Sequence, residues 1–256
     1  MKAKNYSELR NESKATSRFG RVFGKLVGKQ RVLKVVEFSA DVFERITGKV
    51  VSRGSLNDLM LSERSVEYFW VLRNLNVPVT DSRSRLLDVG CGPSFFPVLM
   101  ASQGVEVWAV DLEDYKWKTH HIQFIKGDVR TADIQADYFD WVTAISVLEH
   151  VGFSQGLLVE TDADREAVRS MARFLKPGGK VLATMPYGQE AIMRGWRVYN
   201  DTRIERVFAD LEIRQRSFFM DREGTWFPAS HDEARKVIYS NPNSNCKGIV
   251  CLELIR

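Results

Sequence analysis

The segment Leu86-Leu-Asp-Val-Gly-Cys-Gly-Pro-Ser94 joins a short apolar run to a glycine-containing turn. An apolar run that carries a single acid, Asp88, is typical of a buried strand that ends at a polar site. Gly90 and Gly92 allow a sharp turn and a close backbone approach to a ligand, because glycine tolerates positive φ angles. A dinucleotide fingerprint would need a third glycine where Phe95 stands, and the sequence has no Gly-Lys-Ser/Thr of a phosphate-binding loop. The turn therefore predicts a ligand site and disfavours hydride transfer and P-loop chemistry.

Two further acids follow the next two expected strands. Residues 105–110 are followed directly by Asp111, and residues 122–125 are followed shortly by Asp128. The carboxyl ends of parallel strands meet at one edge of a sheet, so Asp88 is expected to lie near both. A carboxylate accepts hydrogen bonds from ribose hydroxyls and repels a 2′-phosphate. The three acids therefore predict a cationic or hydroxyl-rich ligand at this edge.

Short apolar runs alternate with helical segments from residue 85 onward. We expect strands at 85–89, 105–110, 122–125, 139–145, 180–185, 213–220 and 248–255, and helices at 97–103, 162–175 and 202–211. This alternation is typical of an α/β fold whose doubly wound, mostly parallel, Rossmann-like sheet has helices on both faces.

The positive charge of the sequence is concentrated near its N-terminus. Residues 1–36 hold ten Lys and Arg against two Glu, so the remaining 220 residues carry a net charge of −4 within a total of +4. Apolar residues at helical spacing over 19–36 predict a basic amphipathic helix, although each of its three glycines costs about 1 kcal/mol. We expect two parts: residues 1–80, a basic helical arm and cap, and residues 81–256, the α/β domain.

The arm leaves several partners open. It can dock on its own domain, or residues 15–36 can contact an anionic membrane surface. It can also serve as an element exchanged in a homodimer, and nucleic acid is the less favoured partner.

Composition and cysteine spacing narrow the class of protein. The 256 residues are 44% hydrophobic, as in an ordinary globular protein of one large domain or of one domain with an appendage. No apolar run reaches the length of a membrane span, and the first 18 residues lack the apolar region of a secretory signal. The three cysteines have no CxxC spacing, so we expect neither disulfides nor a metal site. We expect a cytoplasmic location, with peripheral membrane contact as an extension of it.

Five segments resemble, in order, the motifs of the class I S-adenosylmethionine-dependent methyltransferases. They read LLDVGCGPS (86–94), VWAVDLED (107–114), FIKGDVR (124–130), FDWVTAISVLEHVG (139–152) and FLKPGGKVLATMPYG (174–188). The resemblance implies a seven-stranded sheet with a reversed last strand, S-adenosyl-L-methionine as cofactor and S-adenosyl-L-homocysteine as product.

The resemblance also implies roles for individual residues. Gly90 and Gly92 would approach the methionyl part of the cofactor, with Asp88 as the strand-end acid beside them. The ribose and the adenine would contact Asp111, Leu112, Asp128 and the backbone of Val129. The methionyl side would be lined by Ile145 and Ser146.

Methyl transfer to a hydroxyl needs a group that takes up the proton. The candidates are His150, just past the fourth strand, and Tyr187, after the fifth; His231 is expected in a solvated loop. The Asp/Asn-Pro-Pro-Tyr/Phe segment of enzymes that methylate bases is not found after the fourth strand, which disfavours base N-methylation.

The expected acceptor is a hydroxyl of a small molecule or of a lipid-linked sugar. A looser resemblance to small methyltransferases of bacterial and archaeal glycan biosynthesis supports the sugar, and a small aromatic metabolite is its nearest competitor. Two other functions remain open: an RNA-binding methyltransferase that uses the basic arm, and a protein that binds S-adenosylmethionine without catalysis.

Overall fold

The computed structural model describes residues 62–75, 84–117, 119, 121–241 and 245–256. The basic arm, with the helix expected over residues 19–36, lies outside the described residues. Among the described residues, no helix is long and apolar enough to cross a bilayer.

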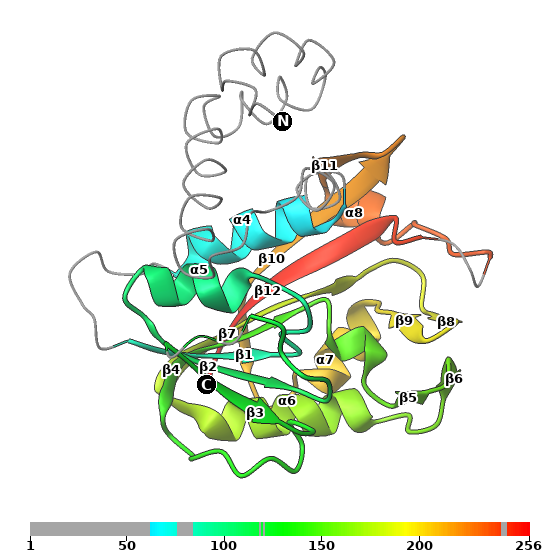
Figure 1. The fold of residues 1–256 in the computed structure, drawn as a ribbon. Helices are drawn as coiled ribbons and strands as arrows, with labels where there is room; N and C mark the ends of the chain where they lie inside the picture. Colours follow the sequence, from blue (N-terminus) through cyan, green and yellow to red (C-terminus); the bar gives the residue numbers. More distant parts are fainter. Residues whose placement is uncertain (1–61, 76–83, 118, 120, 242–244) are drawn as a thin grey trace, which may run out of the picture. The chain divides into compact units, whose positions relative to one another are not determined.

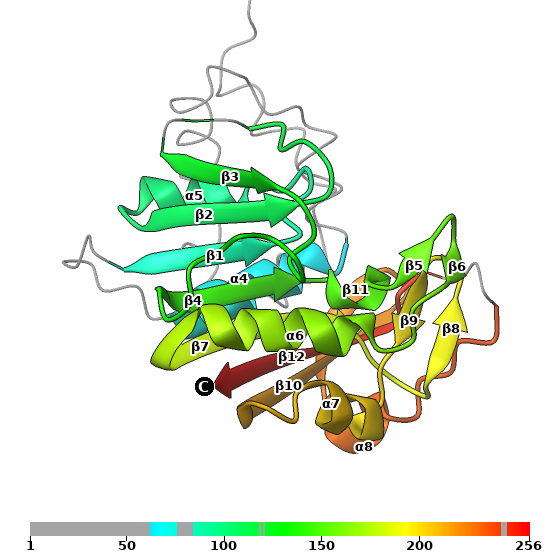
Figure 2. The ribbon, with the colours of Figure 1, turned by 90° about the horizontal axis from the view of Figure 1, so that it is seen from below.

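One sheet organises the described part of the chain (Figures 1 and 2). Its strand order is β11-β10-β12-β7-β4-β1-β2-β3. The strands are β1 (Arg85–Val89), β2 (Glu106–Asp111), β3 (Ile122–Lys126), β4 (Phe139–Ile145), β7 (Leu175–Pro186), β10 (Glu212–Arg222), β11 (Thr225–Ala229) and β12 (Gly248–Ile255). Strands β3, β2, β1, β4 and β7 pair in parallel, whereas β12 is antiparallel to both β7 and β10. The doubly wound fold and the reversed last strand are confirmed.

The expected count of seven strands is wrong, because the described sheet has eight. The additional strand β11 pairs with β10 across a two-residue turn, Glu223-Gly224. Both turn residues have positive φ angles, 55° and 76°, which match the twist of a tight hairpin. The turn therefore folds residues 225–229 back onto the edge of the sheet instead of leaving them in a loop.

Helices cover both faces of the sheet. Figure 1 shows α4 (Arg64–Leu75) and α5 (Phe96–Ser102) on one face, and α6 (Ala163–Phe174) and α7 (Asp201–Val207) on the other. The inner side of α6 carries Ala167, Val168 and Met171, which are fully buried. Burial of each larger apolar side chain contributes roughly 1.5–3 kcal/mol, so packing fixes these helices on the sheet.

Shorter elements follow the carboxyl ends of β4, β7 and β11. They are the 3₁₀ turn η4 (Leu148–His150), the hairpins β5 (Phe153–Ser154) with β6 (Leu157–Leu158) and β8 (Ala191–Met193) with β9 (Trp196–Val198), and α8 (His231–Ala234). The two hairpins touch at their turns, where the Gly195 amide donates to the Gly156 carbonyl at 3.0 Å. The candidate functional residues sit on these elements and on the turns after β1, β2 and β3.

Candidate cofactor site and active site

The turn after β1 has the backbone geometry that only glycine adopts readily. Gly90 and Gly92 have φ angles of 68° and 45°. A Cβ atom on Gly90 would lie 2.4 Å from Cγ1 of Val147, whereas one on Gly92 would meet no atom closer than 3.9 Å. Gly90 therefore permits close packing against the segment after β4, and Gly92 leaves the turn open on the side where a ligand can approach.

Asp111 joins this turn to the end of β2. Its Oδ2 accepts a hydrogen bond from the Gly92 amide at 2.7 Å, and its Oδ1 accepts one from the Glu113 amide at 2.9 Å. Each carboxylate oxygen can accept further hydrogen bonds, so the side chain retains capacity for a diol. The next side chain, Leu112, is 66% exposed although it is apolar. A diol acceptor beside an exposed apolar side chain fits the ribose and adenine of S-adenosylmethionine.

Asp88 lies beneath the turn rather than on its surface. It is 3% exposed, and its Oδ1 accepts a hydrogen bond from Thr143 Oγ1 at 2.7 Å. The pKa of Asp88 is raised to about 7, mainly by burial; the Thr143 hydrogen bond and the charge of Arg64 oppose this shift, and the charge of Asp111 adds to it. Asp88 therefore ties the end of β1 to β4.

Asp128 is held by an arginine that the sequence analysis missed. Arg130 Nε donates to Oδ1 at 3.1 Å and to Oδ2 at 3.0 Å, and Nη2 donates to Oδ2 at 2.7 Å. The backbone amide of Arg130 donates to Oδ1 at 2.9 Å. This pairing lowers the pKa of Asp128 and outweighs the partial burial that raises it. The same guanidinium contacts Glu160 and Glu166. The side chain of Val129, between the two partners, is buried.

Helix α4 reaches the carboxyl ends of β4 and β7, which the sequence analysis also missed. Arg64 donates from Nη1 to the carbonyl of Ile145 at 2.6 Å. Glu67, which is fully buried, accepts hydrogen bonds from Ser146 Oγ at 2.5 Å and from Thr184 Oγ1 at 2.7 Å. Burial raises the pKa of Glu67, while Arg64 opposes the shift. The methionyl side predicted at Ile145 and Ser146 is therefore fixed by α4.

His150 has the hydrogen bonding that a general base needs. Its Nδ1 lies 2.8 Å from the carbonyl of Gly195, which can only accept, so in the neutral ring Nδ1 carries the proton. Nε2 then keeps a lone pair. Partial desolvation lowers the pKa of His150 and outweighs the Gly195 hydrogen bond, which raises it. The positive charge of Arg64 lowers the pKa further, so the neutral ring is favoured. The neighbouring Glu149 is buried, and its burial raises its pKa to about 8.

Tyr187, the second candidate base, is more deeply buried than His150 and has different hydrogen-bond partners. It is fully buried, and its hydroxyl lies 3.1 Å from Nε2 of His231, which is also 2.8 Å from Oδ2 of Asp201. Burial, together with the hydrogen bond to Asp201, raises the pKa of Tyr187 far above its usual value. The Tyr187 hydroxyl is thus directed toward α7 and α8, whereas His150 faces the β8–β9 turn.

The loop expected around His231 is wrong, because His231 begins α8. Ser230 and Glu233 form a reciprocal capping box at its start, with Ser230 Oγ accepting from the Glu233 amide at 3.3 Å and Glu233 Oε2 accepting from the Ser230 amide at 2.9 Å. The pattern Ser-x-x-Glu was the signal available in the sequence.

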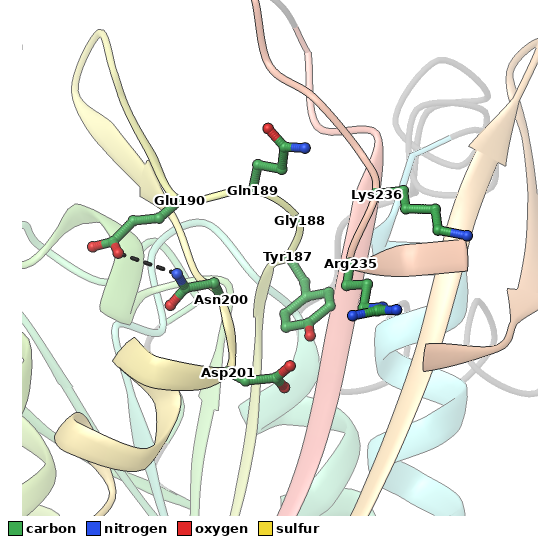
Figure 3. A pocket seen from close by; sticks show the side chains of 8 residues that line it. All are labelled: Tyr187, Gly188, Gln189, Glu190, Asn200, Asp201, Arg235 and Lys236. Carbon is green, nitrogen blue, oxygen red and sulfur yellow. Dashed lines mark hydrogen bonds between the residues drawn. The ribbon is translucent and has the colours of Figure 1, made fainter. Parts of the chain in front are cut away.

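A cavity of about 530 Å³ lies beside Tyr187 (Figure 3). It is lined by residues 187–190, Asn200, Asp201, Arg235 and Lys236. Except for Gly188, every lining residue has a polar side chain, and two carboxylates and two cations are among them.

The chain shares its central motifs with a known family. Residues 87–183 match the model of a family described as "Methyltransferase domain". This segment contains β1, the glycine turn, Asp111, Asp128 and η4, in the fold described above. Over these residues the chain is therefore similar to a methyltransferase domain.

Relatives with curated names are similar over part of the chain. Ubiquinone biosynthesis O-methyltransferases of Idiomarina loihiensis and Xanthomonas oryzae pv. oryzae are each 32% identical over 107 and 108 residues, respectively. The match covers 38% of this chain and 40–41% of those proteins.

Solved structures show the same fold over more of the chain. The N-methyltransferase NodS from Bradyrhizobium japonicum, in complex with S-adenosyl-l-homocysteine, has a TM-score of 0.52 at 16% identity and covers 85% of this chain and 98% of its own. The [4+2]-cyclase SpnF has a TM-score of 0.54 at 16% identity and covers 76% of this chain and 82% of its own. These likenesses concern the fold, and its neighbours carry more than one chemistry.

Proposed function

We propose that the protein transfers a methyl group from S-adenosyl-L-methionine to a hydroxyl of a small, hydrophilic acceptor. The observation that carries this proposal is the cradle of Gly92, Asp111 and Leu112 at the same sheet edge as a neutral His150. The cofactor supplies an already activated methyl group, so the chain must bind it, exclude water, orient the acceptor and accept one proton.

Each of these tasks has a residue that suits it. Asp111 is the acceptor for the ribose hydroxyls, and Leu112 is the apolar surface for the adenine. Asp128, which Arg130 orients, and the backbone of Val129 bind the adenine edge in this proposal. His150 takes the hydroxyl proton on Nε2, since Nδ1 is committed to the Gly195 carbonyl. Tyr187 lines the acceptor cavity rather than accepting the proton, because its raised pKa makes deprotonation costly.

Two acceptor classes follow from different observations. The curated relatives carry a name that refers to ubiquinone biosynthesis and O-methylation, which supports a hydroxyl as the methylated group. The cavity beside Tyr187 is lined almost entirely by polar side chains, which supports a sugar over an apolar, isoprenoid-bearing molecule. A lipid-linked sugar and a homodimer remain predictions. Membrane contact through residues 15–36 is a further prediction, and those residues lie outside the described part of the chain.

Replacement of His150 by glutamine is expected to lower the rate of methyl transfer by roughly 10²–10⁴-fold, the usual contribution of a positioned general base. The affinity for S-adenosylhomocysteine should stay within about twofold, because His150 is assigned to the acceptor side. Transfer of labelled methyl to a panel of D-glucuronate, methyl glucoside and catechol measures the rate, and His121→Gln is the matched control. If the His150→Gln enzyme is fully active, His150 is not the general base.

The pH profile of the wild-type enzyme tests the same role. The surroundings lower the pKa of His150 below its ordinary 6.5, so the ring is neutral at pH 7 and can accept a proton. The ring becomes protonated, and can no longer act as a base, only in more acidic solution. Activity should therefore fall as the pH decreases through the lowered pKa of His150, below about pH 6.5. An acid limb centred above pH 7 would contradict this assignment.

A further inference from the structure

The cavity beside Tyr187 is closed by elements that the seven-strand pattern does not contain. The additional hairpin strand β11 leads into α8, and the end of α8 brings Arg235 and Lys236 to the carboxyl end of β7. Both cations lie outside residues 87–183, the part that matches the methyltransferase domain model. The positive charge that these two residues bring to the cavity is therefore not part of the matched methyltransferase segment.

The two acids of the cavity are already neutralised by the protein. Asp201 accepts from Arg216 Nη1 at 3.0 Å through Oδ1 and lies 2.8 Å from His231 Nε2 through Oδ2. Glu190 accepts from Asn200 Nδ2 at 3.3 Å and lies 3.8 Å from Arg203 Nη1. Neither carboxylate is left as an unpaired negative charge that would repel an anion.

Arg235 and Lys236, the two cations of the cavity, form either a more exposed ion pair than those of the two acids or none within the described residues. Arg235 uses Nε for an ion pair of 3.0 Å with Asp232, whose side chain is 74% exposed. Such exposed pairs contribute little, so they yield readily to a better partner. Lys236 is exposed, and no acid within the described residues forms an ion pair with it. Figure 3 shows both cations on one side of Tyr187, with Glu190 and Asn200 on the other.

The two walls of the cavity are fixed to each other. The Gln189 amide donates to the carbonyl of Val237 at 2.8 Å. A Cβ atom on Gly188 would lie 2.6 Å from the same carbonyl oxygen, so only glycine allows this approach. The loop after β7 and the segment after α8 therefore hold Arg235 and Lys236 at a constant place beside Tyr187.

We propose that this cavity binds an acceptor that carries an anionic group, a carboxylate or a phosphate, on a hydroxyl-bearing ring of sugar size. Arg235 and Lys236 hold the anionic group, and the side-chain amide of Gln189 binds ring hydroxyls. The volume of about 530 Å³ lies within the usual range for small-molecule sites. The inference rests on the proposed function, whose acceptor it specifies.

Calorimetric titrations with three sugars test the inference. D-glucuronate, glucose 6-phosphate and glucose are each titrated into the full chain, with and without saturating S-adenosylhomocysteine. At least one charged sugar should bind at least about fivefold more tightly than glucose, and the stronger of the two identifies the carboxylate or the phosphate. Equal affinity for all three sugars, or binding of none, would overturn the inference.

Variants separate this site from the cofactor site. The double variant R235Q/K236Q should lose at least about fivefold in affinity for the favoured charged sugar and should bind glucose and S-adenosylhomocysteine as the wild type does. Arg73→Gln, an exposed arginine of α4, is the control for loss of charge. An unchanged charged-sugar affinity in the double variant refutes the site. If the wild type does not bind S-adenosylhomocysteine, the proposed function is refuted. The titrations with sugar alone then still test the inference.

Discussion

Replacement of Asp111 by alanine weakens the binding of S-adenosylmethionine and S-adenosylhomocysteine by at least about 100-fold, because hydrogen bonds to a charged group contribute about 1.5–3 kcal/mol each. The variant loses the acceptor for the ribose and also the bond of 2.7 Å that orients the Gly92 amide. Both losses weaken the binding of the same ligand. Calorimetric titration with both compounds measures the effect.

Two further variants make this result specific. Asp133→Ala removes an exposed acid of the loop after β3 and should leave the cofactor affinity unchanged. Asp111→Asn keeps one acceptor oxygen and should give an intermediate affinity. Circular dichroism checks that each variant is folded. A folded Asp111→Ala protein whose dissociation constant is within threefold of the wild type would mean that the cofactor lies elsewhere.

Replacement of Asp164 by alanine is expected to lower the free energy of unfolding by about 3–5 kcal/mol, the usual cost of removing one partner from a buried ion pair. Asp164 is fully buried on α6 and accepts from Arg203 Nη2 at 2.9 Å and Tyr199 Oη at 2.8 Å. It also lies 3.3 Å from Nη1 of Arg197, which is fully buried. Without Asp164, Arg197 is a buried charge whose nearest acid is gone.

Urea denaturation of the variant measures this cost. The matched control is Asp162→Ala, two residues earlier, which removes an ion pair with Arg206 whose side chains are 45% and 55% exposed. The control should cost less than about 1 kcal/mol, since solvent screens exposed pairs. If Asp164→Ala costs no more than Asp162→Ala, the network does not hold α6 to β9 and α7 as described.

The sequence predicted the features that depend only on residues close together in the chain. Each parallel strand is an apolar run, and the turn after β1 needs glycine for the positive φ angles of Gly90 and Gly92. Asp111 also follows from its place, because a residue directly after a strand must lie at the edge of the sheet. The resemblance to a known family then gave these positions their expected roles.

The features that it missed depend on contacts between distant residues. Glu67 meets Ser146 and Thr184, which lie 79 and 117 positions away, and nothing in the helical pattern of α4 indicates these partners. The contact of His231 with Tyr187 was missed for the same reason, because the two residues lie 44 positions apart. The hairpin strand β11 is a different case, because the Glu223-Gly224 turn was visible between two apolar runs and could have been predicted.

The central claim is that the edge formed by the ends of β1, β2 and β3 binds S-adenosylmethionine. Titration of the purified chain with S-adenosylmethionine, S-adenosylhomocysteine and, as a control, NAD tests this claim most directly. Micromolar binding of the first two compounds and no binding of NAD is the predicted result. Binding of NAD, or no binding of either S-adenosyl compound to the folded chain, would contradict it.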